Sequence, residues 1–215
     1  MKKIGILGTG TVGKTIGSAL LKLGYEVKMG SRTADNVSAM EFSKLGGTKA
    51  SHGTFAEAAQ FADIIMNCTL GMASLQALEL TGKENLKGKI LIDISNPLDF
   101  SQGMPPSLTI CNTDSLGEQI QLALPETMVV KTLNIVNCEV MVNPKKSGGD
   151  PTMFVCGNEA KAKEDTISLL KEFGWMDIID LGDITNARGT EMLLPIWVRT
   201  YIATKNGYFA FKVIR

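Results

Sequence analysis

The stretch KIGILGTGTVGKTIGSALLKLGYEVKMGSR, residues 3–32, predicts the fold of this protein. Residues 3–8 are mostly apolar or glycine and predict a buried strand. Residues 11–23 carry apolar side chains at helical spacing, and Gly24 is a typical residue to end a helix. Residues 25–30 predict a second strand. A strand, a glycine turn, a helix and a second strand form the unit that opens a dinucleotide-binding α/β domain.

The alternation of short apolar runs and helical patterns continues along the chain. Further strands are predicted at residues 48–51, 63–69, 89–95, 128–134, 152–157 and 176–181. Further helices are predicted at residues 34–45, 54–61, 73–80, 114–123, 159–173 and 186–210. This order predicts the α/β class: a Rossmann-type, doubly wound, mostly parallel sheet with a C-terminal strand and helix extension. We expect residues 1–142 to form the dinucleotide-binding core. We expect residues 143–215, which start with an exposed loop at 143–151, to pack on the same sheet rather than form an independent domain.

The composition excludes several classes of function. The 215 residues include 22 basic and 22 acidic side chains, and this zero net charge argues against binding to nucleic acid or to an anionic membrane. No apolar run reaches the roughly 18 residues that span a bilayer, so we expect a cytoplasmic protein. The chain has a single histidine, His52, and its four cysteines form no C-x-x-C pair, so we expect neither a metal site nor a Ser-His-Asp triad.

The glycine-rich turn has the pattern G-x-G-x-x-G, formed by Gly8, Thr9, Gly10, Thr11, Val12 and Gly13. Gly8 permits the tight turn, Gly10 lets the backbone approach a pyrophosphate, and Gly13 lets the helix pack closely on the sheet. The phosphates would then lie at the positive end of the helix. All six residues are therefore candidate cofactor-binding residues.

The same turn also satisfies the pattern of a nucleoside-triphosphate loop, G-x-x-x-x-G-K-T. In that alternative Lys14 would contact the phosphates and Thr15 would bind magnesium, with Asp93 as the acidic partner on the metal side.

The end of the second strand favours the dinucleotide. NAD-binding units carry an acidic residue there, about 20 residues after the glycines, to bind the ribose 2′-hydroxyl. This chain has Ser31 and Arg32 instead. A guanidinium binds a phosphate through two charged hydrogen bonds, so the pair predicts NADP(H). The alternative is that Ser31 caps the next helix and that Arg32 is merely solvated.

Other candidate residues follow later strands, because ligands of such sheets bind beyond the carboxyl ends of the strands. Thr69, Leu70 and Gly71 would contact the ribose and pyrophosphate, and Asn96 and Pro97 would lie near the nicotinamide. The segment 132–134 is a weaker candidate. Each segment has a local alternative as well, because Thr69 can cap a helix and Asn96-Pro97 can initiate a turn.

The terminal helix carries Arg188, Glu191 and Arg199 among apolar residues. It could form a dimer surface or one wall of a pocket for a second substrate, but a helix simply packed on the sheet is the expectation.

Residues 5–32 resemble the start of the NADPH-dependent coenzyme F420 reductase family, and the segments 155–175 (VCGNEAKAKEDTISLLKEFGW) and 179–197 (IDLGDITNARGTEMLLPIW) are similar to its C-terminal half. The resemblance implies hydride transfer between NADP(H) and a deazaflavin in a cytoplasmic homodimer. It also implies that Thr9 and the amides of the glycine loop hold the pyrophosphate.

Two positions depart from the family pattern: Asn36 stands where a lysine is frequent, and Gly71 stands where a proline is frequent. The segments ISNPLD (94–99) and KTLNIVNCEV (131–140) are closer to bacterial relatives and to the reductase domain of membrane metalloreductases.

We therefore expect an oxidoreductase that transfers a hydride between NADP(H) and a small-molecule acceptor, either coenzyme F420 or a flavin. Such a transfer needs no histidine base, and we name no catalytic side chain. An NADP-dependent reductase of another small substrate would need a proton donor, for which Lys131 is conceivable. A sensor that binds NADP without catalysis is the remaining alternative.

Overall fold

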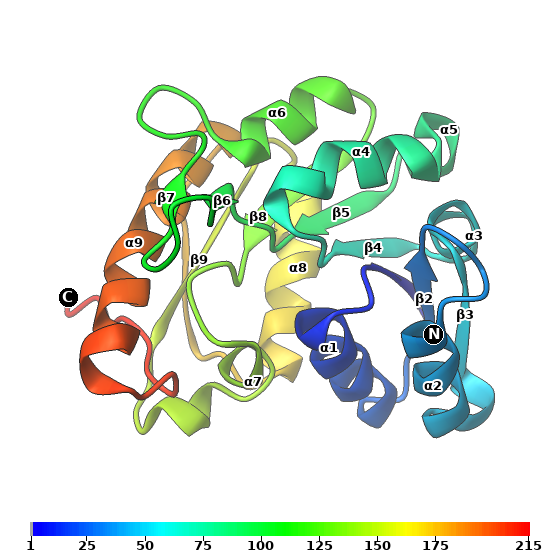
Figure 1. Ribbon diagram of the computed structural model, residues 1–215, viewed down its shortest axis with the longest axis horizontal. Helices are drawn as coiled ribbons and strands as arrows, with labels where there is room; N and C mark the ends of the chain where they lie inside the picture. The colour runs from blue at the N-terminus through cyan, green and yellow to red at the C-terminus, as the bar shows by residue number, and fades with distance from the viewer. Residues whose placement is uncertain (1) are drawn as a thin grey trace.

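The computed structural model describes residues 2–215, so residue 1 of the predicted core lies outside the described residues. Its strands are β1 (Lys3–Leu7), β2 (Glu26–Ser31), β3 (Ala50–Thr54), β4 (Ile64–Asn67), β5 (Ile90–Asp93), β8 (Met128–Thr132), β9 (Thr152–Gly157) and β10 (Asp177–Asp180). They form one eight-stranded sheet in the order β10-β9-β8-β5-β4-β1-β2-β3 (Figure 1). The chain therefore starts in the middle of the sheet and winds outward in both directions, as a doubly wound fold requires.

The sheet is mostly parallel, as the sequence predicts. β8 and β9 are the one antiparallel pair within it, with Val130 opposite Gly157. β9 and β10 pair in parallel at the far edge of the same sheet. The carboxyl ends of β1, β2, β4, β5 and β8 thus point to one side, and the loops that follow them meet there.

Helices cover both faces of the sheet, and each face buries its own apolar cluster. One face packs against α1 (Thr11–Lys22), α2 (Val37–Leu45), α7 (Cys138–Met141) and α8 (Ala160–Glu172). The other packs against α3 (Phe55–Phe61), α4 (Gly71–Thr81), α5 (Lys83–Leu86) and α6 (Leu116–Ala123). The central strands are consequently buried on both sides, which explains their unbroken apolar runs.

Local hydrogen bonds set where the helices begin. Thr54 and Glu57 form a reciprocal capping box at the start of α3, with 2.7 Å from the Thr54 amide to Glu57 Oε2. The predicted helix at 34–45 begins only at Val37, because the Asn36 side chain accepts a bond from the Ala39 amide and caps α2.

The last helix is shorter than predicted. α9 (Ala187–Thr204) ends where Lys205 takes a left-handed conformation, with φ of 54°. Asn206 and Gly207 follow, and both residues favour turns over helix. The prediction of helix for residues 205–210 is therefore wrong. These residues belong to an extended C-terminal tail (206–215), in which Phe211 accepts a bond from the Thr152 amide at the start of β9.

Several short elements escaped the sequence analysis because they are too short to show a period. They are α5, α7, the 3₁₀ turn Pro144–Ser147 within the predicted loop, and the two-stranded hairpin β6 (Leu98–Asp99) and β7 (Ser107–Leu108). Within residues 2–215, no helix combines the length and the apolar character needed to cross a membrane.

Candidate functional site

The glycine loop lies between β1 and α1, and each glycine has a different spatial reason. Gly8 has φ of +113°, and a Cβ there would lie 2.7 Å from the carbonyl oxygen of Cys68. At Gly13 a Cβ would lie 2.3 Å from the carbonyl oxygen of Gly8, so only glycine lets α1 approach the turn this closely. A Cβ at Gly10 would meet no heavy atom within 4 Å. Gly10 therefore faces open space, as a close approach to a ligand requires.

The start of α1 is suited to an anion. Gly10 is the N-cap residue of α1, so no side chain bonds to the free amides of the first turn, and that turn contains no acidic residue. The first backbone N–H groups of a helix have no partner within it and carry the positive end of its dipole. These features, together with the open space at Gly10, fit a dinucleotide pyrophosphate.

Ser31 and Arg32 end β2 beside this loop. The Ser31 hydroxyl donates to the carbonyl of Thr33 at 2.6 Å, so it shapes the backbone of the turn and does not cap α2. Arg32 is exposed, and no ion pair joins its guanidinium to any other residue in the described range 2–215. A free guanidinium at this position fits the 2′-phosphate of NADP.

A cavity of about 700 Å³, which we call the glycine-loop cavity, brings these residues together. Its walls come from residues 8–12, residues 31–33, residues 68–70, Asn36 and one face of α4. The side of α4 that lines it was not predicted from the sequence.

Thr69 is part of a polar junction that follows β4. Its hydroxyl donates to Asn67 Oδ1 at 2.6 Å, and its Oγ1 lies 2.8 Å from Ser74 Oγ on α4. Thr69 does not cap α4, because the residue before that helix is Leu70 and no side chain caps it. The junction fixes the backbone of residues 67–70 along the cavity wall.

The loop after β5 touches the start of α4. A Cβ at Gly71 would lie 1.8 Å from the carbonyl oxygen of Asn96, so only glycine permits this contact. Asn96 Nδ2 donates to the Asn134 carbonyl at 2.8 Å, and Asn134 Nδ2 donates to Asn96 Oδ1 at 2.9 Å. This pair joins the loops that follow β5 and β8.

A second cavity, of about 450 Å³, lies against α9, and we call it the α9 cavity. Its floor contains Asn96 and Asn134, and α9 supplies one wall through Leu194, Trp197, Val198 and Tyr201. The remaining walls come from Gly71, Met72 and the loop that carries Phe100, Met104 and Pro106. The expectation that the terminal helix is simply packed on the sheet is therefore incomplete, because the helix forms the wall of a pocket.

The two cavities adjoin each other. Val12, Cys68, Thr69 and Leu70 line both of them. A ligand that extends from the glycine loop past Thr69 would reach the α9 cavity, and a second molecule in that cavity would contact its end.

The predicted residues separate into three groups. Gly8, Thr9, Gly10, Thr11, Val12, Ser31, Arg32, Thr69 and Leu70 line the glycine-loop cavity. Gly71 and Asn96 line the α9 cavity. Gly13 and Pro97 line neither, since Gly13 is packed under the loop and the Pro97 carbonyl accepts a bond from the Thr109 amide. The structure fits the alternative in which the terminal helix forms one wall of a pocket. The spacings Leu194–Val198 and Trp197–Tyr201 place these side chains on one side of the helix.

The geometry contradicts the nucleoside-triphosphate alternative. Lys14 lies 3.9 Å from Glu41 and does not line the glycine-loop cavity. The Thr15 hydroxyl donates to Cys138 Sγ, and Asp93 is fully buried and paired with Lys131. None of the three groups lines the glycine-loop cavity, where a triphosphate would have to bind.

The Cys68 thiol lies at the boundary between the cavities, in surroundings that favour its neutral form. Burial raises the pKa of Cys68, and the nearby Asp93 carboxylate raises it further. The neutral thiol therefore acts as part of the cavity wall.

Comparisons with known proteins show the family of this chain. Residues 3–97 match the family model described as NADP oxidoreductase, coenzyme F420-dependent. A crystal structure of a candidate F420-dependent NADP reductase from Arthrobacter sp. FB24 is 50% identical, with a TM-score of 0.94 and coverage of 100% of both chains.

Two curated relatives match a smaller part of their own length. The F420-dependent NADP reductase of Methanocaldococcus jannaschii is 31% identical over 58% of this chain and 56% of that protein. Metalloreductase STEAP3 of Rattus norvegicus is 24% identical over 91% of this chain, which spans only 38% of that protein. The match of residues 3–97, which include the glycine loop, and the full-length likeness to the Arthrobacter structure lead to one assignment: the chain belongs to the family of coenzyme F420-dependent NADP oxidoreductases.

Proposed function

We propose that this protein is an NADP(H)-dependent oxidoreductase that transfers a hydride between NADP(H) and a deazaflavin, with a flavin as the alternative acceptor. One observation carries the proposal: the glycine-loop cavity and the α9 cavity share the wall formed by Val12, Cys68, Thr69 and Leu70. Two reactants that meet at a shared wall can react directly, as a hydride transfer requires.

In this proposal the glycine-loop cavity holds NADP(H). The first amides of α1 and the Gly10 backbone bind the pyrophosphate, and Arg32 binds the 2′-phosphate. Thr69 borders the nicotinamide end, because it lines both cavities where they join, and Asn96 faces that end from the side of the α9 cavity. When bound, NADP(H) supplies the hydride.

The α9 cavity then holds the acceptor ring. Its lining is mainly apolar and includes Trp197, which is stacked with Tyr201 at a centroid distance of 5.9 Å. Apolar walls with a few polar groups such as Asn96 and Asn134 suit a flat heterocycle, because the walls exclude water and the amides fix its orientation.

The residues of the chain do not need to supply an acid or a base for the hydride itself. Their contribution is to bind both rings, orient them face to face and keep water out of the junction. The chemistry thus depends on positioning.

The assembly and the location are also proposals. The family resemblance supports a cytoplasmic homodimer, and exposed apolar side chains near the mouth of the α9 cavity, among them Met72, Phe100 and Met104, favour contact with a second copy. Light scattering during gel filtration measures this directly, and a monomer at micromolar concentration would contradict it.

The test of function is a titration with NADPH, NADH and Mg-ATP, followed by turnover with coenzyme F420, FMN, FAD and riboflavin. We expect tight binding of NADPH, weak binding of NADH, no binding of Mg-ATP, and the fastest turnover with F420. Faster turnover with FMN or FAD would identify a flavin reductase. Binding of NADPH without turnover on any acceptor would favour a sensor or a reductase of another small substrate.

A further inference from the structure

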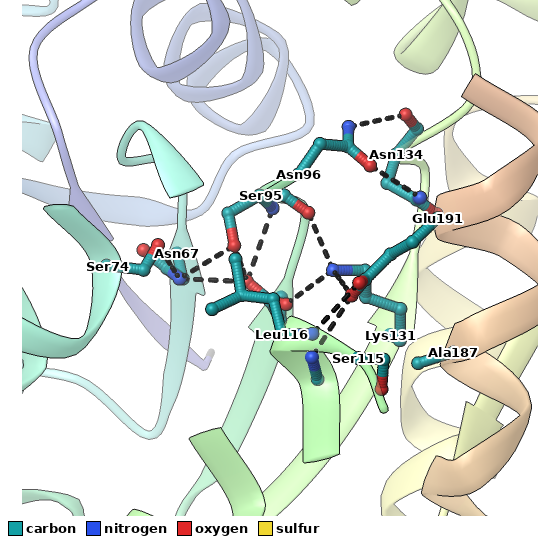
Figure 2. A network of polar contacts seen from close by, with 12 residues as sticks. Asn67, Ser74, Ser95, Asn96, Ser115, Leu116, Lys131, Asn134, Ala187 and Glu191 are labelled. Atoms are coloured by element: carbon teal, nitrogen blue, oxygen red, sulfur yellow. Dashed lines mark hydrogen bonds and ion pairs between the residues drawn. The ribbon is translucent and has the colours of Figure 1, made fainter. Parts of the chain in front are cut away.

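A buried ammonium lies beneath the junction of the two cavities. Lys131, on β8, is fully buried, and its Nζ contacts three oxygen atoms that come from different segments (Figure 2). Nζ lies 2.8 Å from Asp93 Oδ2, 2.6 Å from the Ser95 carbonyl oxygen and 2.7 Å from Glu191 Oε1. All three protons of the ammonium are therefore used.

The Asp93 side of this network holds the loops at the ends of β4 and β5. Asp93 Oδ1 accepts bonds from the Ser95 hydroxyl at 2.7 Å and from Asn67 Nδ2 at 2.8 Å (Figure 2). Asn67 in turn accepts the bond from the Thr69 hydroxyl. Thr69 and Ser95, which line the α9 cavity, are thus tied to one buried carboxylate.

The Glu191 side holds the helical wall. Glu191 lies on α9, and its carboxylate also accepts bonds from the Leu116 and Gly117 amides at the start of α6, at 2.9 and 3.0 Å. Leu194 and Val198 follow at three and seven residues, so they share the helix side of Glu191 and line the α9 cavity. The orientation of this wall depends on where Glu191 is held.

Lys131 lines neither cavity, and its ammonium protons point at three oxygen atoms of the protein, so it is not placed to donate a proton to a reactant. Burial by itself would lower the pKa of its ammonium, but Asp93 and Glu191 outweigh the burial and raise that pKa. The lysine stays charged and fully hydrogen-bonded.

Stability alone does not account for this arrangement. Buried ion pairs contribute little net stability compared with apolar residues of the same volume, because removing the charges from water is costly. What such a network does provide is a fixed geometry among the groups that it joins.

We infer that Lys131 is a positioning residue for hydride transfer: held between Asp93 and Glu191, its ammonium fixes the α9 wall of the acceptor cavity relative to the strand-end loops that border the nicotinamide. The inference rests on the proposed function. It assigns a role to a group that touches neither reactant.

The test uses Glu191→Gln and Asp93→Asn in the full chain. Glutamine offers one carbonyl oxygen, so it cannot accept bonds from Lys131 and from both α6 amides at once. Lys131→Met is less suitable, because it leaves two buried carboxylates without a counter-charge and can prevent folding. The matched control is Arg188→Gln, because Arg188 joins the same two helices through Glu118, at 2.8 Å, and contacts neither loop.

Four quantities are measured for each variant: the melting temperature, the dissociation constant of NADPH, the dissociation constant of 2′,5′-ADP, and the single-turnover rate from saturating NADPH to coenzyme F420. The fragment 2′,5′-ADP occupies only the half of the site next to Arg32. We expect Glu191→Gln to slow hydride transfer about tenfold or more, since misplacement of a reactant by about 1 Å is costly for such reactions. The affinity for NADPH should fall by roughly threefold or more. The affinity for 2′,5′-ADP should stay unchanged.

Two further results follow from a shared role. The variants Asp93→Asn and Glu191→Gln combined should be little slower than the worse single variant, because both break the same arrangement. Arg188→Gln should lower the melting temperature. It should change neither the rate of hydride transfer nor the ratio of NADPH affinity to 2′,5′-ADP affinity.

The inference is overturned if Glu191→Gln and Asp93→Asn lower the melting temperature but keep the wild-type rate of hydride transfer and the wild-type ratio of NADPH to 2′,5′-ADP affinity. The role of the network would then be structural only. If the wild-type protein itself transfers no hydride, the proposed function fails. The ratio of NADPH to 2′,5′-ADP affinity then still decides whether the network positions the nicotinamide half.

Discussion

At the residue scale, Ser31 and Arg32 have different roles at the end of β2. The Ser31 hydroxyl is bonded to the Thr33 carbonyl and is nearly buried, so it maintains the turn. Arg32 is exposed on the wall of the glycine-loop cavity. We therefore propose that discrimination between NADP and NAD depends mainly on the Arg32 guanidinium.

Arg32→Ala should weaken the binding of NADPH much more than the binding of NADH. The lost charged hydrogen bonds to the 2′-phosphate are worth about 1.5–3 kcal/mol, and NADH has no such group. Fluorescence titration with both nucleotides measures the difference. Arg199→Ala, an exposed arginine on α9 outside both cavities, is the control and should change neither affinity. Equal weakening of the two nucleotides by Arg32→Ala would mean that the arginine is misassigned.

Gly10→Ala should lose NADPH affinity while keeping its stability, and Gly13→Ala should lose stability. A methyl group at Gly10 enters open space, so the melting temperature should stay unchanged while NADPH binds less well. A methyl group at Gly13 collides with the Gly8 carbonyl, so the free energy of unfolding should fall by about 1–3 kcal/mol. Calorimetry and NADPH titration of both variants separate the two effects. A large loss of stability in Gly10→Ala would contradict the assignment.

At the scale of elements, α9 has two sides with different roles. One side carries Glu191, Leu194 and Val198, which face the buried network or the α9 cavity. Ile196 is 50% exposed and lines neither cavity. The helix is therefore both a support for the sheet and one wall of the α9 cavity.

Val198→Trp should reduce acceptor binding and leave NADPH binding intact. The larger ring would occupy the α9 cavity, which does not hold the pyrophosphate or the 2′-phosphate. We expect the KM for coenzyme F420 to rise about tenfold, equivalent to about 1.4 kcal/mol. Steady-state kinetics test this, with Ile196→Trp on the outer side of α9 as the matched control. An unchanged KM in Val198→Trp would place the acceptor elsewhere.

At the scale of the whole molecule, the C-terminal tail joins α9 to the edge of the sheet. Phe209 stacks on Trp197 with a centroid distance of 5.2 Å, and Lys212 and Arg215 pair with Asp177 on β10 at 2.9 and 2.7 Å. The tail thus supports Trp197, which lines the α9 cavity.

Asp177→Asn should release the tail at neutral pH. Hydrogen bonds from Lys212 and Thr152 hold the pKa of the Asp177 carboxyl well below its usual range. Because the folded-state pKa is lowered, this contribution to stability is present above the unfolded value of about 3.9 and is lost only as the pH falls through the folded value. The rate of carboxypeptidase digestion at pH 7 should rise in Asp177→Asn.

Asp150→Asn serves as its control, because Asp150 contacts only Lys212 and is more exposed. In the wild-type protein, Trp197 fluorescence should report a docked tail from pH 8 down to about 4. Release of the tail near pH 6 would contradict this account of Asp177.

The class of fold could be predicted from the sequence, and so could the glycine loop and Arg32 as residues of one site. Buried strands, helical periods and glycine turns depend on neighbours within a few residues, and such local patterns are readable along the chain. The glycine loop and Arg32 were found in this way, and the structure brings them to one cavity.

The α9 cavity as a whole could not be predicted from the sequence, although Asn96 and a pocket wall on the terminal helix were candidates. The contact of Lys131 with Asp93 and Glu191, the contact of Gly71 with Asn96, and the α9 wall join residues that lie 25 or more positions apart in the chain. Residues 206–215 likewise run beside distant strands, where Thr152 on β9 contacts Phe211 and Asp177 on β10 contacts Lys212. Contacts of this kind depend on which distant segments the sheet brings together, and no local period along the chain encodes them.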